Sequence, residues 1–317
     1  MDHDPRTRID SGSIPGGAQG YKKASKMKTR SEWLEKKRTL LTASEVAAVL
    51  GIDPHNTALG VYVNKTVGYS DEQCEAFAFG HDMEEPLSRM YSRRTWRQVV
   101  DLGSTEIQVH PDIPWLGATL DRQVTREDGI TGPLELKTVA GKRAAEWLTD
   151  SKPDHNQIQL QIQMSCTSAS WGALAGLVWG TDMLHEDYYF NREFFEAAYP
   201  YLEEFWGRVQ RNDPPPVTSP RCIQAIKRLY SKDDGEIIVL GQEHADLVAR
   251  REILNAEKKT MDDEKDEIDA KLRSVMGQAT FGALPDGRFV SLKTTKRGGY
   301  TVQPTTFRAM RIVKGIK

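Results

Sequence analysis

The chain has 317 residues, a formal net charge of −2 and 38% hydrophobic residues. These values describe a globular protein with room for one main domain and an appendage, and they argue against a protein that coats nucleic acid. No apolar run approaches the roughly 18 residues of a membrane span, and the N-terminus lacks the apolar core of a signal peptide. The three cysteines are few and far apart, which predicts neither a disulfide framework nor a zinc site; we expect a reducing, cytoplasmic compartment.

Basic residues gather in two segments. Residues 21–38 hold eight Lys or Arg against two Glu, and residues 288–317 hold eight and no acid. Either segment can contact phosphates or simply be solvated surface. Residues 1–29 are rich in Gly, Ser, Pro and charge, so we expect a disordered basic tail there.

The chain from residue 31 onward predicts several helices. Residues 31–52 favour two, with Ser31 capping the first and either Thr42 or Ser44 capping the second. A third is expected over 78–94, where Glu84 lies at the edge of an apolar stripe and Glu85 points away from it. The alternative for both acids is a favourable position in the first turn of a helix.

Strands are expected over 96–100, 105–110, 115–124 and 133–138. Arg126–Gly129 is turn-prone, so a hairpin would bring Asp121 beside Glu135. Glu135 and Lys137 are two residues apart on a strand and therefore share one face. Two carboxylates and a lysine suit metal-assisted phosphodiester hydrolysis. An exposed hairpin with an ion pair is the alternative, since Glu-x-Lys alone is a weak signal.

Beyond Lys137 we expect a helix over 140–148 and another beginning at His155. Its four glutamines at every second position are more typical of a strand. Next come a buried strand, closing strands near 178–180 and 187–190, and an aromatic-rich helix over 192–209. We expect a linker over 213–242, which begins in a proline run, then a long charged helix over 243–276 and a small basic β-unit up to residue 317.

Asp121 followed by Glu135-x-Lys137 resembles the PD-(D/E)xK nuclease superfamily. The segment His110–Asp121 and four other ordered motifs are similar to one branch, the YqaJ-type viral recombinases of the lambda exonuclease family. The resemblance covers roughly residues 30–210. It implies an α/β fold with a mixed sheet flanked by helices over 30–212, followed by the long helix and the β appendage.

The resemblance also implies roles for individual residues. Asp121, Glu135 and the Leu136 carbonyl would hold metal, and Glu84, with Glu85 as the fallback, would complete the acidic cluster. Lys137 would activate or position the attacking water, and Gln159 would orient it. The expected DNA contacts are Lys37 or Arg38 with Ser44 at a 5′ phosphate, Thr119 near the scissile phosphate, and Gln161. The family has arginine where this chain has Lys37, and lysine lacks arginine's bidentate fork.

The function implied is a Mg²⁺-dependent DNA exonuclease, with Mn²⁺ as a possible substitute, that degrades linear duplex DNA from its 5′ ends in phage-type recombination. The implied partners are DNA ends, a single-strand annealing protein and further copies of the chain in a ring-shaped trimer, within a bacterial host's cytoplasm if the protein is phage-encoded. Two alternatives remain: an endonuclease or helicase-linked nuclease of repair or restriction, and a non-catalytic scaffold that binds DNA ends. No Walker motif is present, so any motor would be a separate chain.

Overall fold

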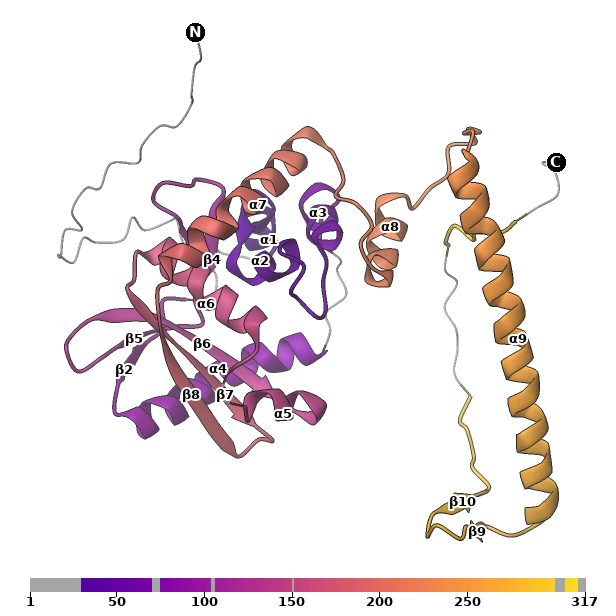
Figure 1. Ribbon diagram of the computed structural model, residues 1–317. Coiled ribbons are helices and arrows are strands. Elements are labelled where there is room, and N and C mark those ends of the chain that lie inside the picture. The colour runs from indigo at the N-terminus through magenta and orange to yellow at the C-terminus, as the bar shows by residue number, and fades with distance from the viewer. Residues whose placement is uncertain (1–29, 70–74, 104–105, 150, 300–305, 313–317) are drawn as a thin grey trace. The chain divides into compact units, whose positions relative to one another are not determined.

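The structure is a computed structural model that describes residues 30–69, 75–103, 106–149, 151–299 and 306–312 (Figure 1). The tail expected at residues 1–29 lies outside this range. The chain divides into two compact units, Met1–Tyr230 and Ser231–Lys317, and each is described by itself.

A five-stranded sheet forms the centre of the first unit. Its strands, in spatial order, are β2 (Gln98–Val100), β5 (Arg122–Thr125), β6 (Thr131–Val139), β7 (Trp171–Val178) and β8 (Asp182–Tyr189). Strands β6 and β7 run parallel, whereas the other neighbours run antiparallel. The sheet is therefore mixed. Every residue of β7 is buried, which explains its continuous apolar sequence.

Alternate residues of the sheet face two helical layers (Figure 1). Leu134 and Leu136 of β6 pack in one cluster with Leu87 and Tyr91 of α4 (Glu75–Thr95). The opposite face is covered by α6 (Asp154–Thr167) and by the short α5 (Ala144–Trp147), which follows a 3-10 turn at Gly141–Arg143. The predicted α/β architecture, a mixed sheet flanked by helices, is confirmed.

A second, smaller sheet joins the N-terminal helices to this core. Its order is β1 (Leu41–Thr42), β4 (Leu116–Thr119) and β3 (Ile107–Val109), with β1 parallel to β4. The two helices expected over 31–52 are α1 (Arg30–Arg38) and α2 (Ala43–Val49), and Thr42, not Ser44, is the N-cap residue of α2. Helix α3 (Ala58–Thr66) was not foreseen; it and α7 (Arg192–Arg211) pack against α2.

The first unit extends past its expected end at residue 212. Its last elements are a 3-10 turn at Pro220–Cys222 and α8 (Ile223–Leu229), which packs on α3. Cys222 is fully buried, and the Arg228 guanidinium donates a hydrogen bond of 2.9 Å to the side chain of Asn64. The proline run at 214–216 is therefore not the boundary, because the chain returns to the core before Tyr230.

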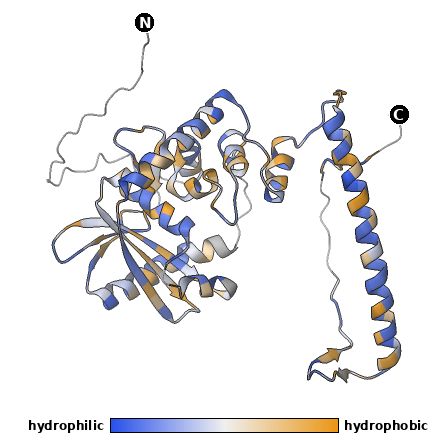
Figure 2. Cartoon of the chain, viewed as in Figure 1, coloured by the Kyte–Doolittle hydropathy of each residue, from blue (hydrophilic) through white to orange (hydrophobic). Residues whose placement is uncertain are grey.

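The second unit consists of the long helix α9 (Gln242–Met276) and a hairpin of β9 (Phe281–Ala283) and β10 (Phe289–Ser291). Both elements were predicted, although residues 300–305 and 313–317 of the expected β-unit lie outside the described residues. Hydrophobic residues recur along α9 among hydrophilic ones (Figure 2). None of the described residues of this unit is buried.

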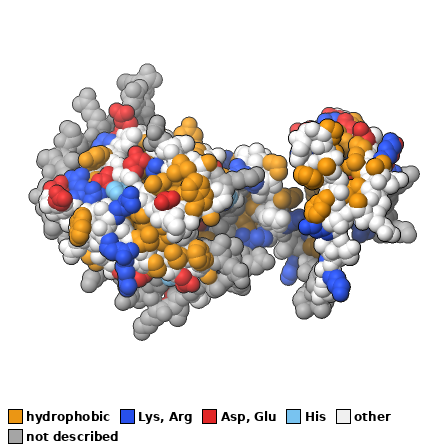
Figure 3. All heavy atoms as spheres, turned by 90° about the horizontal axis from the view of Figure 1, so that it is seen from below, with side chains coloured by type: hydrophobic (Ala, Val, Ile, Leu, Met, Phe, Trp, Pro, Cys, Tyr) orange, Lys and Arg blue, Asp and Glu red, His pale blue; other side chains and the backbone are white. Residues whose placement is uncertain are grey.

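The surface carries mixed charge. On the face of the first unit in Figure 3, acidic and basic side chains lie near one another and do not form one large basic field. Of the helices in the described ranges, none is both long and apolar enough to cross a membrane.

Candidate active site

Glu135 and Lys137 leave strand β6 on the face that α6 covers. Glu135 is fully buried, whereas the Lys137 side chain is 32% exposed. The Lys137 ammonium forms an ion pair with the Glu135 carboxylate. This is the shared face that the spacing of two residues predicts.

Asp121 lies in the connection between β4 and β5, and the hairpin brings it to the same strand. Its Oδ2 accepts a hydrogen bond of 2.8 Å from the backbone N–H of Leu136. Burial raises the pKa of Asp121 well above its usual value, and the neighbouring Glu135 carboxylate raises it further. The site therefore holds closely spaced carboxyl groups whose combined ionisation is unfavourable without a cation.

Lys137 supplies one positive charge beside these groups. Burial alone would lower the pKa of Lys137, but the carboxylates of Glu135, Asp121 and Glu84 outweigh burial, so its pKa is raised. Lys137 is consequently an ammonium ion at neutral pH in the metal-free protein. In that state it can donate hydrogen bonds and stabilise negative charge, but it cannot accept a proton.

Two glutamines of α6 hold the Glu135 carboxylate from the other side. Gln159 donates to Oε1 of Glu135 at 2.7 Å, and its own Oε1 lies 3.4 Å from the Lys137 ammonium. Gln163, which is fully buried, donates to Oε2 of Glu135 at 2.6 Å and to the Thr119 carbonyl at 3.2 Å. Residues four apart share a helix face, so helical spacing from Gln159 could have identified Gln163.

Gln161 does not have the expected position for a DNA contact. It lies on a different face of α6 and is buried. Its amide donates to the Tyr189 carbonyl at 2.9 Å and accepts from the Asn191 backbone N–H at 2.8 Å. Gln161 therefore ties α6 to the junction of β8 and α7. Thr119 is the last residue of β4, two residues before Asp121, and its side chain is half-buried.

Glu84 and Glu85 of α4 are joined to the site by Arg122, a residue that no sequence pattern singled out. Arg122, which is buried, donates to the Asp121 carbonyl, to Oε2 of Glu84 at 3.2 Å and to Oε2 of Glu85 at 3.3 Å. Glu84 also contacts His81 at 2.9 Å. Its carboxylate is close enough to raise the pKa of Asp121, whereas Glu85 is half exposed and pairs with Arg89. Glu84 is thus the nearer of the two to the acidic pair.

The donor set fits a hard divalent cation bound through few protein ligands. Among the described residues, no group of three or more His, Cys, Asp or Glu side chains converges as a complete metal cage. Mg²⁺ does not need one, because it keeps several waters and is usually held by one or two carboxylates plus substrate phosphate. The paired carboxyl groups of Asp121 and Glu135 meet that requirement, whereas Glu84 is engaged by Arg122 and His81.

The residues expected at a DNA end occupy α1 and α2. The Lys37 ammonium lies over the rings of Trp33 and Tyr69, 5.1 and 5.3 Å from their centroids. Arg38 instead binds the backbone carbonyls at the end of α3, at Lys65 and Thr66. Ser44 is exposed in the first turn of α2. Of the two basic residues considered, Arg38 is committed to the fold, and Lys37 is the one left for an anion.

Comparison with known proteins finds one matching family model, a curated relative and several similar structures. Residues 32–170 match the family model of the YqaJ-like viral recombinase domain. Uncharacterized protein YqaJ of Bacillus subtilis (strain 168) is 22% identical over 263 residues, which cover 81% of each chain. Two solved structures are also similar, and each match covers 58% of this chain and 94% of the other chain. The alkaline exonuclease LHK-Exo from Laribacter hongkongensis has 20% sequence identity and a TM-score of 0.49. LHK-Exo in complex with dAMP has 19% sequence identity and a TM-score of 0.48. Residues 32–170 are therefore similar to a YqaJ-like viral recombinase domain, which is the resemblance that the ordered motifs carry.

Proposed function

We propose that the protein is a metal-dependent deoxyribonuclease that degrades linear duplex DNA from its ends. The observation that carries this proposal is the meeting of Asp121, Glu135 and Lys137 at one point, held there by Gln159 and Gln163. A scaffold that only binds DNA has no need to bury a carboxylate and orient it with two amides. The match of residues 32–170 to the YqaJ-like viral recombinase domain supports the proposal that the substrate is DNA.

The carboxylates of Asp121 and Glu135, with the Leu136 carbonyl, would hold Mg²⁺, or Mn²⁺ in its place. The bound ion would supply a water of lowered pKa and offset charge on the phosphate. The Lys137 ammonium would donate a hydrogen bond to the developing negative charge of the phosphoryl oxygens. Gln159 orients that ammonium, and Gln163 fixes the rotamer of Glu135. Glu84, held by Arg122, would contribute negative charge at the rim and reach the ion through water.

We further propose that hydrolysis proceeds from the 5′ end. This direction rests on the resemblance to lambda-type exonucleases and on Lys37, whose ammonium lies over two aromatic rings. Ser44, the other residue of the resemblance, is exposed in the first turn of α2. A 5′ phosphate would bind there, with Lys37 as a point charge. The trimeric ring and the single-strand annealing partner, like the role in phage-type recombination, rest on the resemblance alone.

Digestion of linear duplex DNA with separately labelled 5′ and 3′ ends tests the proposal. We expect release of the 5′ label as mononucleotide with Mg²⁺, none with EDTA, and none from Glu135→Gln. Gln161→Leu is the matched control, since it replaces a buried glutamine of the same helix that does not contact the carboxylates. Cutting of covalently closed circles would replace the proposal with an endonuclease, and binding of ends without any cleavage would replace it with a scaffold.

A further inference from the structure

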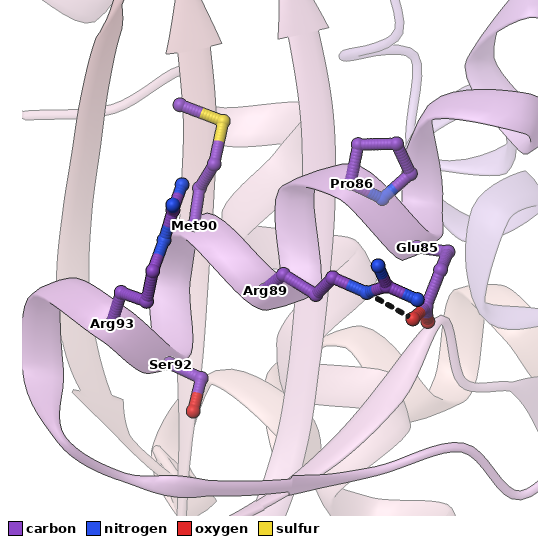
Figure 4. Close-up of a pocket in the computed structure, with 6 residues that line it drawn as sticks. All are labelled: Glu85, Pro86, Arg89, Met90, Ser92 and Arg93. Carbon is purple, nitrogen blue, oxygen red and sulfur yellow. Dashed lines mark hydrogen bonds and ion pairs between the residues drawn. The ribbon is translucent and has the colours of Figure 1, made fainter.

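The outer face of helix α4 carries a groove that the proposed chemistry does not use. Its lining residues all belong to this helix: Glu85, Pro86, Arg89, Met90, Ser92 and Arg93. Figure 4 shows the Arg89 side chain turned toward Glu85, with which it forms an ion pair of 2.7 Å. Residues 85, 89 and 93 are each four apart and therefore form one row along the helix.

The groove begins beside the candidate active site. Glu85 at one end accepts a hydrogen bond of 3.3 Å from Arg122, which also binds Glu84 and the Asp121 carbonyl. Toward the other end the charge becomes positive, because Arg93 and Arg94 are exposed and neither forms an ion pair within the described part of the chain. An anionic chain that leaves the site along α4 would meet arginines.

Trp96 stands where α4 ends, and its conformation is unusual. Its φ is +59°, and its backbone N–H closes the helix on the Ser92 carbonyl at 2.8 Å. That left-handed position at a helix end is normally taken by glycine, because a bulky side chain is strained there. Its side chain is 91% exposed, so burial does not offset the strain. A strained and fully exposed aromatic residue points to a role outside the fold.

We propose that the groove and Trp96 together form a binding track for single-stranded DNA. Arg89 and Arg93 would bind successive phosphates, and Trp96 would stack on a base. Arginines in a groove with an aromatic residue at its end are the combination that binds single strands without sequence preference. Glu85 and Trp96 are eleven residues apart, which is about 16 Å along a helix, enough for a few nucleotides. The inference rests on the proposed function, since the strand would come from the duplex whose other strand is hydrolysed.

Fluorescence anisotropy with a labelled oligothymidylate about 12 nucleotides long, in EDTA, tests the track. Trp96→Gly should bind about tenfold more weakly than the parent, because it loses one stacked base. It should also melt at a higher temperature, since glycine relieves the strained φ. Arg93→Ala should bind more weakly at low salt and reduce the slope of log affinity against log salt by about 1.

Trp179 provides the matched control. It is also exposed and has a φ of +51°, but it lies in the turn between β7 and β8. Trp179→Gly should therefore gain thermal stability and bind the oligonucleotide as the parent does. Equal affinity of Trp96→Gly and the parent would overturn the track while leaving the proposed function intact, provided duplex digestion remains Mg²⁺-dependent. Unlabelled polyglutamate should displace the labelled oligothymidylate poorly. If it displaced the probe as well as unlabelled oligothymidylate did, and if Trp96→Gly and Arg93→Ala weakened its binding equally, the surface would be a site for acidic peptides and the track would be overturned.

Discussion

Substituting Gln163 with leucine tests the support beneath the candidate metal site. Gln163 is fully buried and donates two hydrogen bonds, to the Glu135 carboxylate and to the Thr119 carbonyl. Leucine has a similar volume but no donor, so Oε2 of the buried Glu135 would lose its partner. Hydrogen bonds to charged groups contribute about 1.5–3 kcal/mol, and we expect Gln163→Leu to unfold about 2 kcal/mol more easily than the parent.

The same change should weaken metal binding. Groups that orient a ligating carboxylate typically change metal affinity or activity by about 10- to 100-fold when removed. Two assays measure the effects: urea denaturation in EDTA for stability, and digestion of linear duplex over a range of Mg²⁺ concentrations. Gln161→Leu is the control, because it also loses two partly buried hydrogen bonds but none to Glu135. If Gln163→Leu and Gln161→Leu shared the parent's half-saturating Mg²⁺ concentration, the proposed role of Gln163 would be wrong.

Four further substitutions probe the charges of the candidate active site and of the expected DNA-end contacts. Asp121→Asn should raise the melting temperature in EDTA near neutral pH, since burial and Glu135 raise the folded-state pKa of Asp121, and its favourable contribution to stability is lost as the pH rises through that value. Melting curves between pH 5 and 8 should show the gap to the parent widening with pH, and a constant gap would contradict the assignment. Lys137→Met should abolish hydrolysis yet retain Mg²⁺-induced thermal stabilisation; retained hydrolysis would refute the role of the ammonium. The Lys37→Ala variant should digest 5′-phosphorylated and 5′-hydroxyl ends at equal rates. The Arg38→Ala variant should be less stable but keep the parent's preference between the two kinds of end. If Arg38→Ala lost that preference and Lys37→Ala kept it, Arg38 would be the phosphate-binding residue.

The sequence predicted the local parts of the site because each depends on simple spacing. Asp121, Glu135 and Lys137 were found from a turn-prone segment and from the period of a strand, and the structure brings them together. The glutamines of α6 were harder to interpret, because residues at every second position imitate a strand. The resemblance selected Gln159 and Gln161, whereas helical geometry selects Gln159 and Gln163.

The remaining features depend on contacts between distant segments. Arg122 follows Asp121 directly, yet its role depends on where α4 places Glu84 and Glu85 some 37 residues earlier. The proline run at 214–216 is typical of a linker, but the packing of α8 on α3 keeps residues up to Tyr230 within the first unit. No local pattern encodes either contact.

The central claim is that Asp121 and Glu135 bind a catalytic divalent cation. Anomalous diffraction from crystals soaked in Mn²⁺ tests it most directly, because Mn²⁺ occupies Mg²⁺ sites and can be located by its own signal. We expect one strong peak within about 2.1–2.3 Å of both carboxylates, near the Leu136 carbonyl, and no such peak in Asp121→Asn crystals. Enzyme that digests DNA but binds Mn²⁺ elsewhere, or nowhere, would contradict it.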